Sequence, residues 1–268
     1  NTVDEESGEY NPDREVLERE LKTAEDILNA VALNAPIEVH SGITMNDVGR
    51  GFSGLNAWQP LGITAGAGDK VTIYVGHNSK KTGEATNLKV LASQYHSEAN
   101  AFISSVVNLK VGANVVVIPR IGTLADQESG GALYIEYTGN DLQDRYAVRV
   151  SGGVAVPRLD LYQVTDNAER LARVTAYVRE LESYVAALEE NHNRFHTASD
   201  NAMLNVHDYD KTNCILGASD ILLDTMMLSL PAEQLLAGAG NGTLQEKAAN
   251  MLASLNAMGD MMYLFYQH

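Results

Sequence analysis

The spacing of apolar positions changes period twice along the chain. Between Asn11-Pro12 and about residue 35, apolar side chains recur every three or four positions, at Leu17, Leu21, Ala24, Leu28 and Val31. That spacing predicts an amphipathic helix with proline at its first helical position, ending near Pro36. We therefore take residues 1–35 as an N-terminal helix that buries one face against another part of the protein.

Residues 36–162 have a different pattern. Short apolar and β-branched runs at 71–75, 88–91, 115–118, 133–137 and 146–150 are separated by Gly, Asn, Asp and Pro. The intervals between most runs are too short for crossover helices, which favours antiparallel pairing over a parallel sheet. We predict a β-sandwich domain here.

Helical spacing returns near Thr165, so residues 163–268 are predicted to form a helical segment and the fold class is α+β. Asp166 and Glu169 resemble a capping box before a long apolar stripe that runs from 171 to 188. A second helical stretch is expected at about 213–230, ending at Pro231. A short helical turn is expected before the glycine-rich residues 238–242, and Thr243 is expected to cap a last helix.

The last helix carries an apolar stripe up to Phe265 and has no stop signal before His268. A large exposed apolar surface is uncommon at a natural end of a soluble protein. We therefore expect residue 268 to be a boundary within a longer polypeptide.

Composition narrows the choice of partners. The chain has 19 Lys and Arg against 35 Asp and Glu, a formal charge of -16, and it has no basic cluster, which argues against nucleic acid. No apolar run is long enough for a membrane span, so membrane insertion is not expected. Cys214 is the single cysteine, which excludes an internal disulfide framework and a cysteine-based zinc ribbon. The first residues lack the features of a signal peptide.

The clearest candidate for metal chemistry is the pair His192 and His196, four residues apart in the long helix. In the zinc peptidase motif the residue after the first histidine is a glutamate that activates water, whereas this chain has Asn193 there. Packing at the edge of the apolar stripe is the favoured interpretation of the pair. We predict no catalytic residue and no metal ligand in this chain.

Three aromatic residues are candidate stacking surfaces for a glycan: Trp58 in a turn-rich stretch, Tyr95 after a predicted strand, and Tyr137. Aromatic rings fill protein cores more often than they form such surfaces, and the core interpretation is favoured for Trp58 and Tyr95.

Two segments carry a family signature. Residues 55–75, which include Trp58 and the run Gly66-Ala67-Gly68-Asp69, and residues 130–137, which begin Gly130-Gly131, resemble conserved elements of the enhancin-like, mucin-degrading zinc metallopeptidases. Residues 109–119 fit the same register. The resemblance implies a sandwich that precedes a helical catalytic domain with a His-Glu-x-x-His zinc helix. That motif is absent here, so the resemblance implies that zinc is bound by residues beyond His268.

The leading hypothesis is the N-terminal portion of a secreted or cell-surface bacterial zinc metallopeptidase that acts on glycoproteins such as mucins. In it, this chain is a scaffold or substrate-recognition part. The alternative is a non-catalytic glycan-binding or adhesion module, and a third hypothesis is metal binding through His192 and His196.

Overall fold

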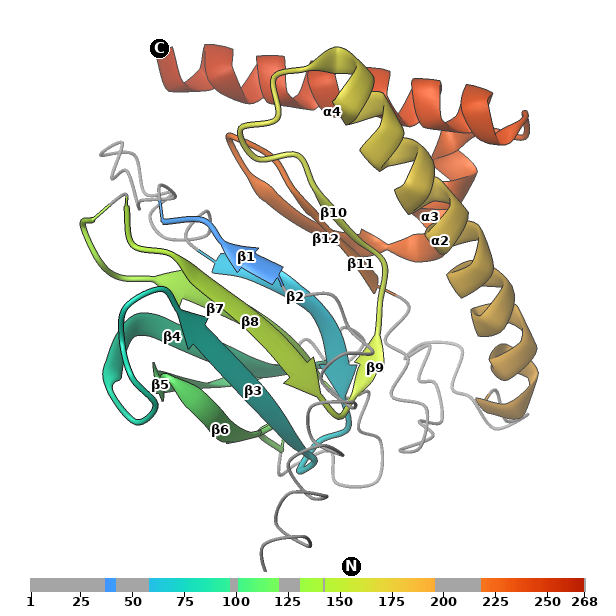
Figure 1. Ribbon diagram of the computed structural model, residues 1–268. Helices are drawn as coiled ribbons and strands as arrows, with labels where there is room; N and C mark the ends of the chain where they lie inside the picture. Colours follow the sequence, from blue (N-terminus) through green and yellow to red (C-terminus); the bar gives the residue numbers. More distant parts are fainter. Residues whose placement is uncertain are drawn as a thin grey trace, which may run out of the picture.

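A computed structural model describes the structure of residues 37–41, 58–96, 101–120, 131–141, 143–195 and 218–267 (Figure 1). The N-terminal helix predicted within residues 1–35 lies outside the described residues. The described chain forms a β-sandwich, a small third sheet beside it, and helices on the far side of that sheet.

The sandwich consists of two antiparallel sheets, as predicted. The four-stranded sheet has the order β1 (Ile37–Val39), β8 (Tyr146–Ser151), β3 (Lys70–His77), β6 (Gly112–Val117). The five-stranded sheet has the order β5 (Ala101–Lys110), β4 (Ala85–His96), β7 (Gly131–Tyr137), β2 (Trp58–Ala65), β9 (Val154–Ala155). Each of the five predicted runs lies in one of these strands, at β3, β4, β6, β7 and β8, except that Ile118 follows the end of β6.

The sandwich core follows from the alternation of side chains along each strand. In β3, Val71, Ile73 and Val75 are buried while the residues between them are not. In β7, Leu133 and Ile135 face the same interior and have no exposed surface. These side chains belong to one hydrophobic cluster formed by both sheets, so the alternation decides which face of each strand packs inward.

The third sheet has the order β10 (Arg158–Asp160), β11 (Ala218–Leu222), β12 (Met227–Pro231). The helices are α2 (Asn167–Phe195), α3 (Ala232–Ala239) and α4 (Leu244–Gln267), and α2 and α4 cross on the side of this sheet that faces away from the sandwich (Figure 1). A second hydrophobic cluster joins the sheet to the helices, with Val174, Val178 and Leu181 of α2 fully buried.

The helix starts predicted at Asp166 and Thr243 are confirmed. The Asp166 side chain accepts a hydrogen bond from the Glu169 backbone N–H at 2.7 Å. At α4 the hydroxyl of Thr243 accepts from the Glu246 N–H at 3.3 Å, and the Glu246 carboxylate accepts from the Thr243 N–H at 2.7 Å. These bonds satisfy N–H groups that a helix start leaves without an intrahelical partner.

The helix predicted at about 213–230 is wrong where the structure describes it. Residues 218–222 form β11, which pairs in parallel with β10, and residues 227–231 form β12. A short apolar run such as Ile221-Leu222-Leu223 suits a fully buried strand as well as a buried helix, and pairing with β10 decides between them. The short helix expected after Pro231 is confirmed as α3.

The turn-rich interpretation of the segment around Trp58 is also wrong. Trp58 begins β2 and pairs with Glu136 of β7, and the register shifts between Pro60 and Thr64. Gly62 lies within this irregularity with a φ of +63°, a conformation that glycine adopts without strain. The bulge lets β2 contain two residues that usually interrupt strands.

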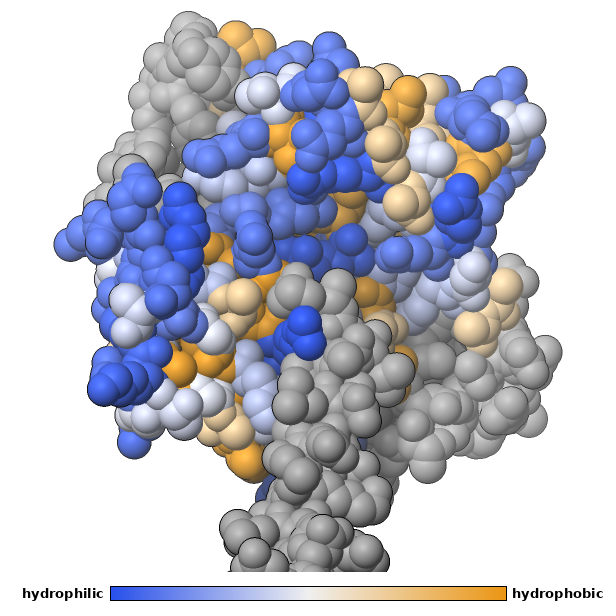
Figure 2. Space-filling model, viewed as in Figure 1, coloured by the Kyte–Doolittle hydropathy of each residue, from blue (hydrophilic) through white to orange (hydrophobic). Residues whose placement is uncertain are grey.

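Where the face of the molecule seen in Figure 1 is formed by described residues, it is mainly hydrophilic, with apolar residues in scattered patches (Figure 2). Within the part of the chain that the structure describes, no helix is both long and apolar enough to cross a membrane.

Candidate functional site

The surface is hollowed where the sandwich meets the third sheet. Two cavities of about 590 and 510 Å³ share Glu38, His40, Tyr162 and Gln163 as lining residues, so together they form one groove with these side chains at its middle. We call it the joint groove. Strand β1 and the residue after it supply Glu38 and His40, and the turn between β10 and α2 supplies Tyr162 and Gln163.

His40 is held by a carboxylate from the third sheet. Its Nε2 lies 2.7 Å from Oδ2 of Asp160, and the Arg158 guanidinium lies 2.8 Å from the same oxygen. Burial by itself would raise the pKa of Asp160, but the hydrogen bond from His40 and the charge of Arg158 outweigh it and hold that pKa below its usual range. Because an ionised carboxylate only accepts, Nε2 of His40 is the donor in this hydrogen bond.

Tyr162 and Gln163 form the opposite side of the groove's middle. The rings of Tyr162 and His40 lie 4.9 Å apart between centroids and are tilted by 53°. Gln163 has a φ of +56° and is the only non-glycine residue with positive φ among the described ranges. Its backbone N–H donates to Asp224 at 2.6 Å, and its side-chain amide donates to the Tyr162 hydroxyl at 3.3 Å. A strained residue held by neighbouring bonds is typical of functional sites.

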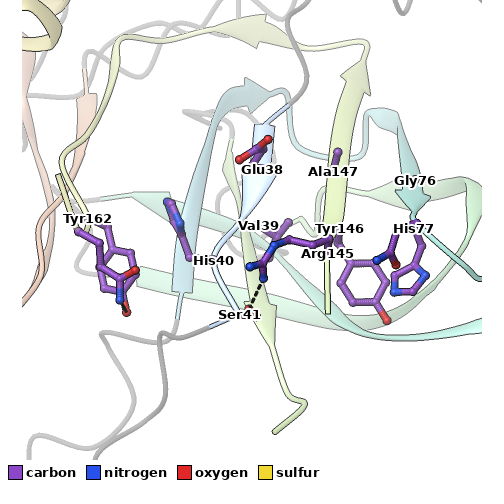
Figure 3. A pocket seen from close by; sticks show the side chains of 12 residues that line it. Glu38, Val39, His40, Ser41, Gly76, His77, Arg145, Tyr146, Ala147 and Tyr162 are labelled. Atoms are coloured by element: carbon purple, nitrogen blue, oxygen red, sulfur yellow. Dashed lines mark hydrogen bonds between the residues drawn. The ribbon is translucent and has the colours of Figure 1, made fainter. Parts of the chain in front are cut away.

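Arg145 and Tyr146 border the larger cavity on the side away from Tyr162 (Figure 3). The Arg145 guanidinium donates to the hydroxyl of Ser41 at 3.5 Å and to the Asp144 carbonyl at 3.3 Å. Glu38 is exposed above the groove in the same view. The groove therefore combines tyrosine rings with amide, imidazole and charged side chains.

Next to this end of the groove lies a partly buried polar cluster centred on Asp144. Its carboxylate accepts hydrogen bonds from His77 at 2.6 Å, Asn87 at 2.9 Å and the Tyr137 hydroxyl at 3.2 Å. Burial alone would raise the pKa of Asp144, but these bonds outweigh it and lower that pKa. Nδ1 of His77 accepts from the backbone of Lys80 at 2.9 Å, so both ring nitrogens hold loops in place.

Of the predicted aromatic residues, Trp58 and Tyr137 have described side chains, and neither lines the joint groove. Tyr137 is 4% exposed and belongs to the sandwich core, so no face of its ring is open to a glycan and the stacking prediction for it is corrected. Trp58 is half-buried at the start of β2, and Tyr95 lies near the end of β4 with its backbone paired to Phe102. For Trp58 and Tyr95, stacking stays a prediction.

The histidine pair is only partly within the described chain. His192 belongs to α2, and His196 lies outside the described residues. Among the residues whose side chains are described, no three His, Cys, Asp or Glu side chains gather in a way that could hold a metal ion.

The sequence analysis missed every residue at the middle of the joint groove. One signal was present: Leu159 and Leu161 are buried, so Arg158, Asp160 and Tyr162 alternate with them and share the opposite face. The partner His40 lies 120 positions earlier in the chain than Asp160, and no local pattern connects the two.

The fold of the described residues is similar to part of the catalytic modules of bacterial metallopeptidases. Among solved structures, the ZmpB metallopeptidase from Clostridium perfringens matches 76% of this chain with a TM-score of 0.50 and 19% identity. The M60 catalytic domain of ZmpC from the same organism, described in complex with the sialyl T antigen, matches 79% with a TM-score of 0.50 and 18% identity. No family model and no curated protein sequence matches the chain.

These matches confirm the resemblance to enhancin-like metallopeptidases. At 18–19% identity, what they confirm is the similarity of fold. The chain spans 36% of the ZmpB structure and 42% of the ZmpC domain. More than half of each neighbour's length has no counterpart in this chain.

Proposed function

We propose that this chain is the N-terminal portion of a secreted bacterial zinc metallopeptidase that acts on glycoproteins such as mucins. The observation that best supports this proposal is the fold match, which covers 76% of this chain and 36% of the ZmpB structure. The resemblance of residues 55–75 and 130–137 to elements of the same family agrees with this fold match.

In this proposal the chain supplies the scaffold and part of the substrate-recognition surface. Zinc and its ligands belong to sequence that follows residue 268, as does a glutamate that acts as the general base. The arrangement comprises a helix at 1–35, a sandwich at 36–162 and the beginning of a catalytic domain at 163–268. The two hydrophobic clusters, one within residues 39–150 and the other within residues 159–255, support a division of the chain into two cores, with Leu159 and Leu161 packing in the second core although they precede residue 162.

The test begins with the coding sequence downstream of residue 268. We expect a His-Glu-x-x-His motif there, and we expect the protein that includes it to cleave mucin glycoprotein. A zinc chelator should abolish cleavage, as should replacement of the motif's glutamate by glutamine. The proposal is wrong if the motif is missing downstream, or if cleavage persists in the chelator and in the glutamine variant.

A further inference from the structure

We propose that the joint groove binds a neutral saccharide, with the Tyr162 ring as a stacking surface and Gln163 and His40 as hydrogen-bonding partners. The ligand class is an uncharged pyranoside, alone or as one unit of a glycan. The inference concerns binding by this chain and does not depend on peptidase activity.

The dimensions of the groove suit such a ligand. Its cavities of about 590 and 510 Å³ lie within the range of roughly 300–1,000 Å³ that is usual for small-molecule sites. They adjoin each other through the residues at the middle of the groove. A single sugar fits one cavity, and a longer glycan extends along both.

The aromatic surface is Tyr162. This residue is half-buried, and its contact with the His40 ring, which Asp160 in turn holds, restrains the orientation of its own ring. The apolar C–H face of a pyranose packs on an aromatic ring, while the phenolic oxygen stays available to polar groups. The structure therefore offers an oriented ring at the middle of the groove.

Directional hydrogen bonding comes from Gln163 and His40. The amide of Gln163 carries both donors and an acceptor, and its backbone is held at a φ of +56° by the bond to Asp224. This conformation costs free energy, and the Asp224 bond maintains it. Nδ1 of His40 takes part in none of the hydrogen bonds found within the described ranges. Vicinal hydroxyls of a sugar match such a mixture of donors and acceptors.

Charge favours a neutral ligand over an anion. The chain has a formal charge of -16, and Glu38 and Asp160 line the groove. The arginines of the groove already have partners: Arg158 binds Asp160, Arg173 binds Glu169, and Arg145 binds Ser41. An anionic sugar would compete with those partners in a negative field.

A peptide is the main rival ligand, because β1 is an edge strand and a peptide could pair with it. At His40, however, the side chain of Gln59 already fills the place of a paired strand. The His40 N–H donates to the Gln59 amide oxygen at 2.8 Å, and the Gln59 amide nitrogen donates to the His40 carbonyl at 2.8 Å. The Gln59 side chain thus occupies the backbone groups at the end of β1 that a peptide strand would need. A sugar bound by side chains therefore fits the groove better than a peptide does.

The test measures binding of methyl glycosides of galactose, glucose and N-acetylgalactosamine to the 268-residue chain by calorimetry and saturation-transfer NMR. N-Acetylneuraminic acid and an unglycosylated Ser/Thr-rich peptide serve as the anionic and peptide probes. At least one neutral glycoside should bind more tightly than either. If none binds, or if only the acid or the peptide binds, the proposal is wrong.

Substitutions locate the site. Gln163→Gly removes the amide at a position whose φ favours glycine, so it should weaken binding about tenfold without lowering the thermal midpoint. Tyr162→Ala should weaken binding about tenfold or more, whereas Tyr162→Phe retains the ring and should stay within about threefold.

The matched control is Tyr74→Ala, at a half-buried tyrosine of β3 that lines neither cavity. It should leave affinity unchanged. Binding that survives both Gln163→Gly and Tyr162→Ala would refute the assignment to this groove, as would an equal loss in Tyr74→Ala. Since each readout is binding by this chain, failure here differs from failure of the peptidase proposal, which is measured as cleavage by a longer protein.

Discussion

Nε2 of His40 and Oδ2 of Asp160 lie 2.7 Å apart, and this contact joins the end of β1 in the sandwich to β10 in the third sheet. The same carboxylate binds Arg158 and accepts a hydrogen bond from the Tyr162 backbone N–H through its other oxygen, at 3.1 Å. One side chain thus fixes both walls of the joint groove, which makes it a structural support of the site.

Asp160→Asn should therefore destabilise the protein in a pH-dependent way. Hydrogen bonds to a charged group contribute about 1.5–3 kcal/mol, and we expect a loss of that order in the free energy of unfolding at pH 7. The folded-state pKa of Asp160 is lowered, so its contribution is present above the unfolded pKa of about 3.9 and disappears as the pH falls through the folded value. Urea titrations at pH 7 and pH 3 measure this.

Glu169→Gln is the matched control, because Glu169 also pairs with an arginine but its side chain is 51% exposed. An exposed pair contributes about 0–1 kcal/mol, so this variant should stay within that range. Equal effects of the two substitutions at pH 7, or a deficit of Asp160→Asn that is unchanged at pH 3, would contradict the role given to Asp160.

The carboxyl group of Asp220 should change the stability of the protein with pH in the direction opposite to Asp160. It is 3% exposed in β11, Ser229 donates a hydrogen bond to it, and no partner is found for its Oδ1 within the described chain. Burial raises the pKa of Asp220 to about 6, although Ser229 and the charge of Arg158 oppose the rise. The charged form is thus disfavoured in the folded state, and stability falls as the pH rises from about 4 through 6.

Asp220→Asn removes the ionisation and should raise the free energy of unfolding at pH 7, by on the order of 2–3 kcal/mol. At pH 4 the variant and the wild type should be nearly equal. Thermal midpoints measured between pH 4 and 8 follow how the stabilities of the variant and the wild type diverge. Asp260→Asn, at an exposed position, is the control. If Asp220→Asn is less stable than the wild type across this range, the carboxylate is satisfied in a way that contradicts the structure.

The predictions succeeded where local pattern and tertiary pairing agree. The alternation in β3 and β7 is unbroken, so apolar positions alone indicate strand and buried face. In β2, Pro60 and Gly62 are turn residues by every local rule, and only the bulged pairing with β7 makes them part of a strand. At β11 the apolar run is compatible with a helix or a strand, and the pairing with β10, which ends at Asp160, makes it a strand.

The site was less predictable than the fold, because it is assembled from distant segments. His40 has no local feature that marks it, and its role depends on Asp160 and Tyr162. The strain at Gln163 is a backbone property that the amino-acid type does not encode, since glutamine is not enriched at positive φ. The sequence pattern therefore predicts which side chains are buried. It does not predict which side chains from distant elements come together in one site.

The hypothesis of metal binding by His192 and His196 has its own test. Structural zinc sites use four protein ligands and catalytic sites usually three, whereas this pair supplies two. We expect zinc titration of the 268-residue chain to release no heat of specific binding, and His192→Ala to behave as the wild type does. A stoichiometric heat signal that disappears in His192→Ala would instead establish a site on this chain.

A substitution at Gly131 tests whether a glycine of the family signature is required by the packing of the sandwich. It begins β7 within the signature at 130–137, and a Cβ at this position would overlap the carbonyl oxygen of Ser93 in β4. Because that neighbour is backbone, the strand pair itself would have to move. We expect Gly131→Ala to lower the free energy of unfolding by about 3 kcal/mol or more.

Gly259→Ala supplies the comparison, because Gly259 lies in α4 with no atom within 4 Å of an added Cβ. Alanine there should stabilise the protein by about 0.5–1 kcal/mol. Urea titration of both variants measures the contrast. If Gly131→Ala is as stable as Gly259→Ala, close packing of β7 on β4 does not explain this glycine. If it is strongly destabilised, this part of the signature records how the sandwich is packed and is not itself a sign of catalysis.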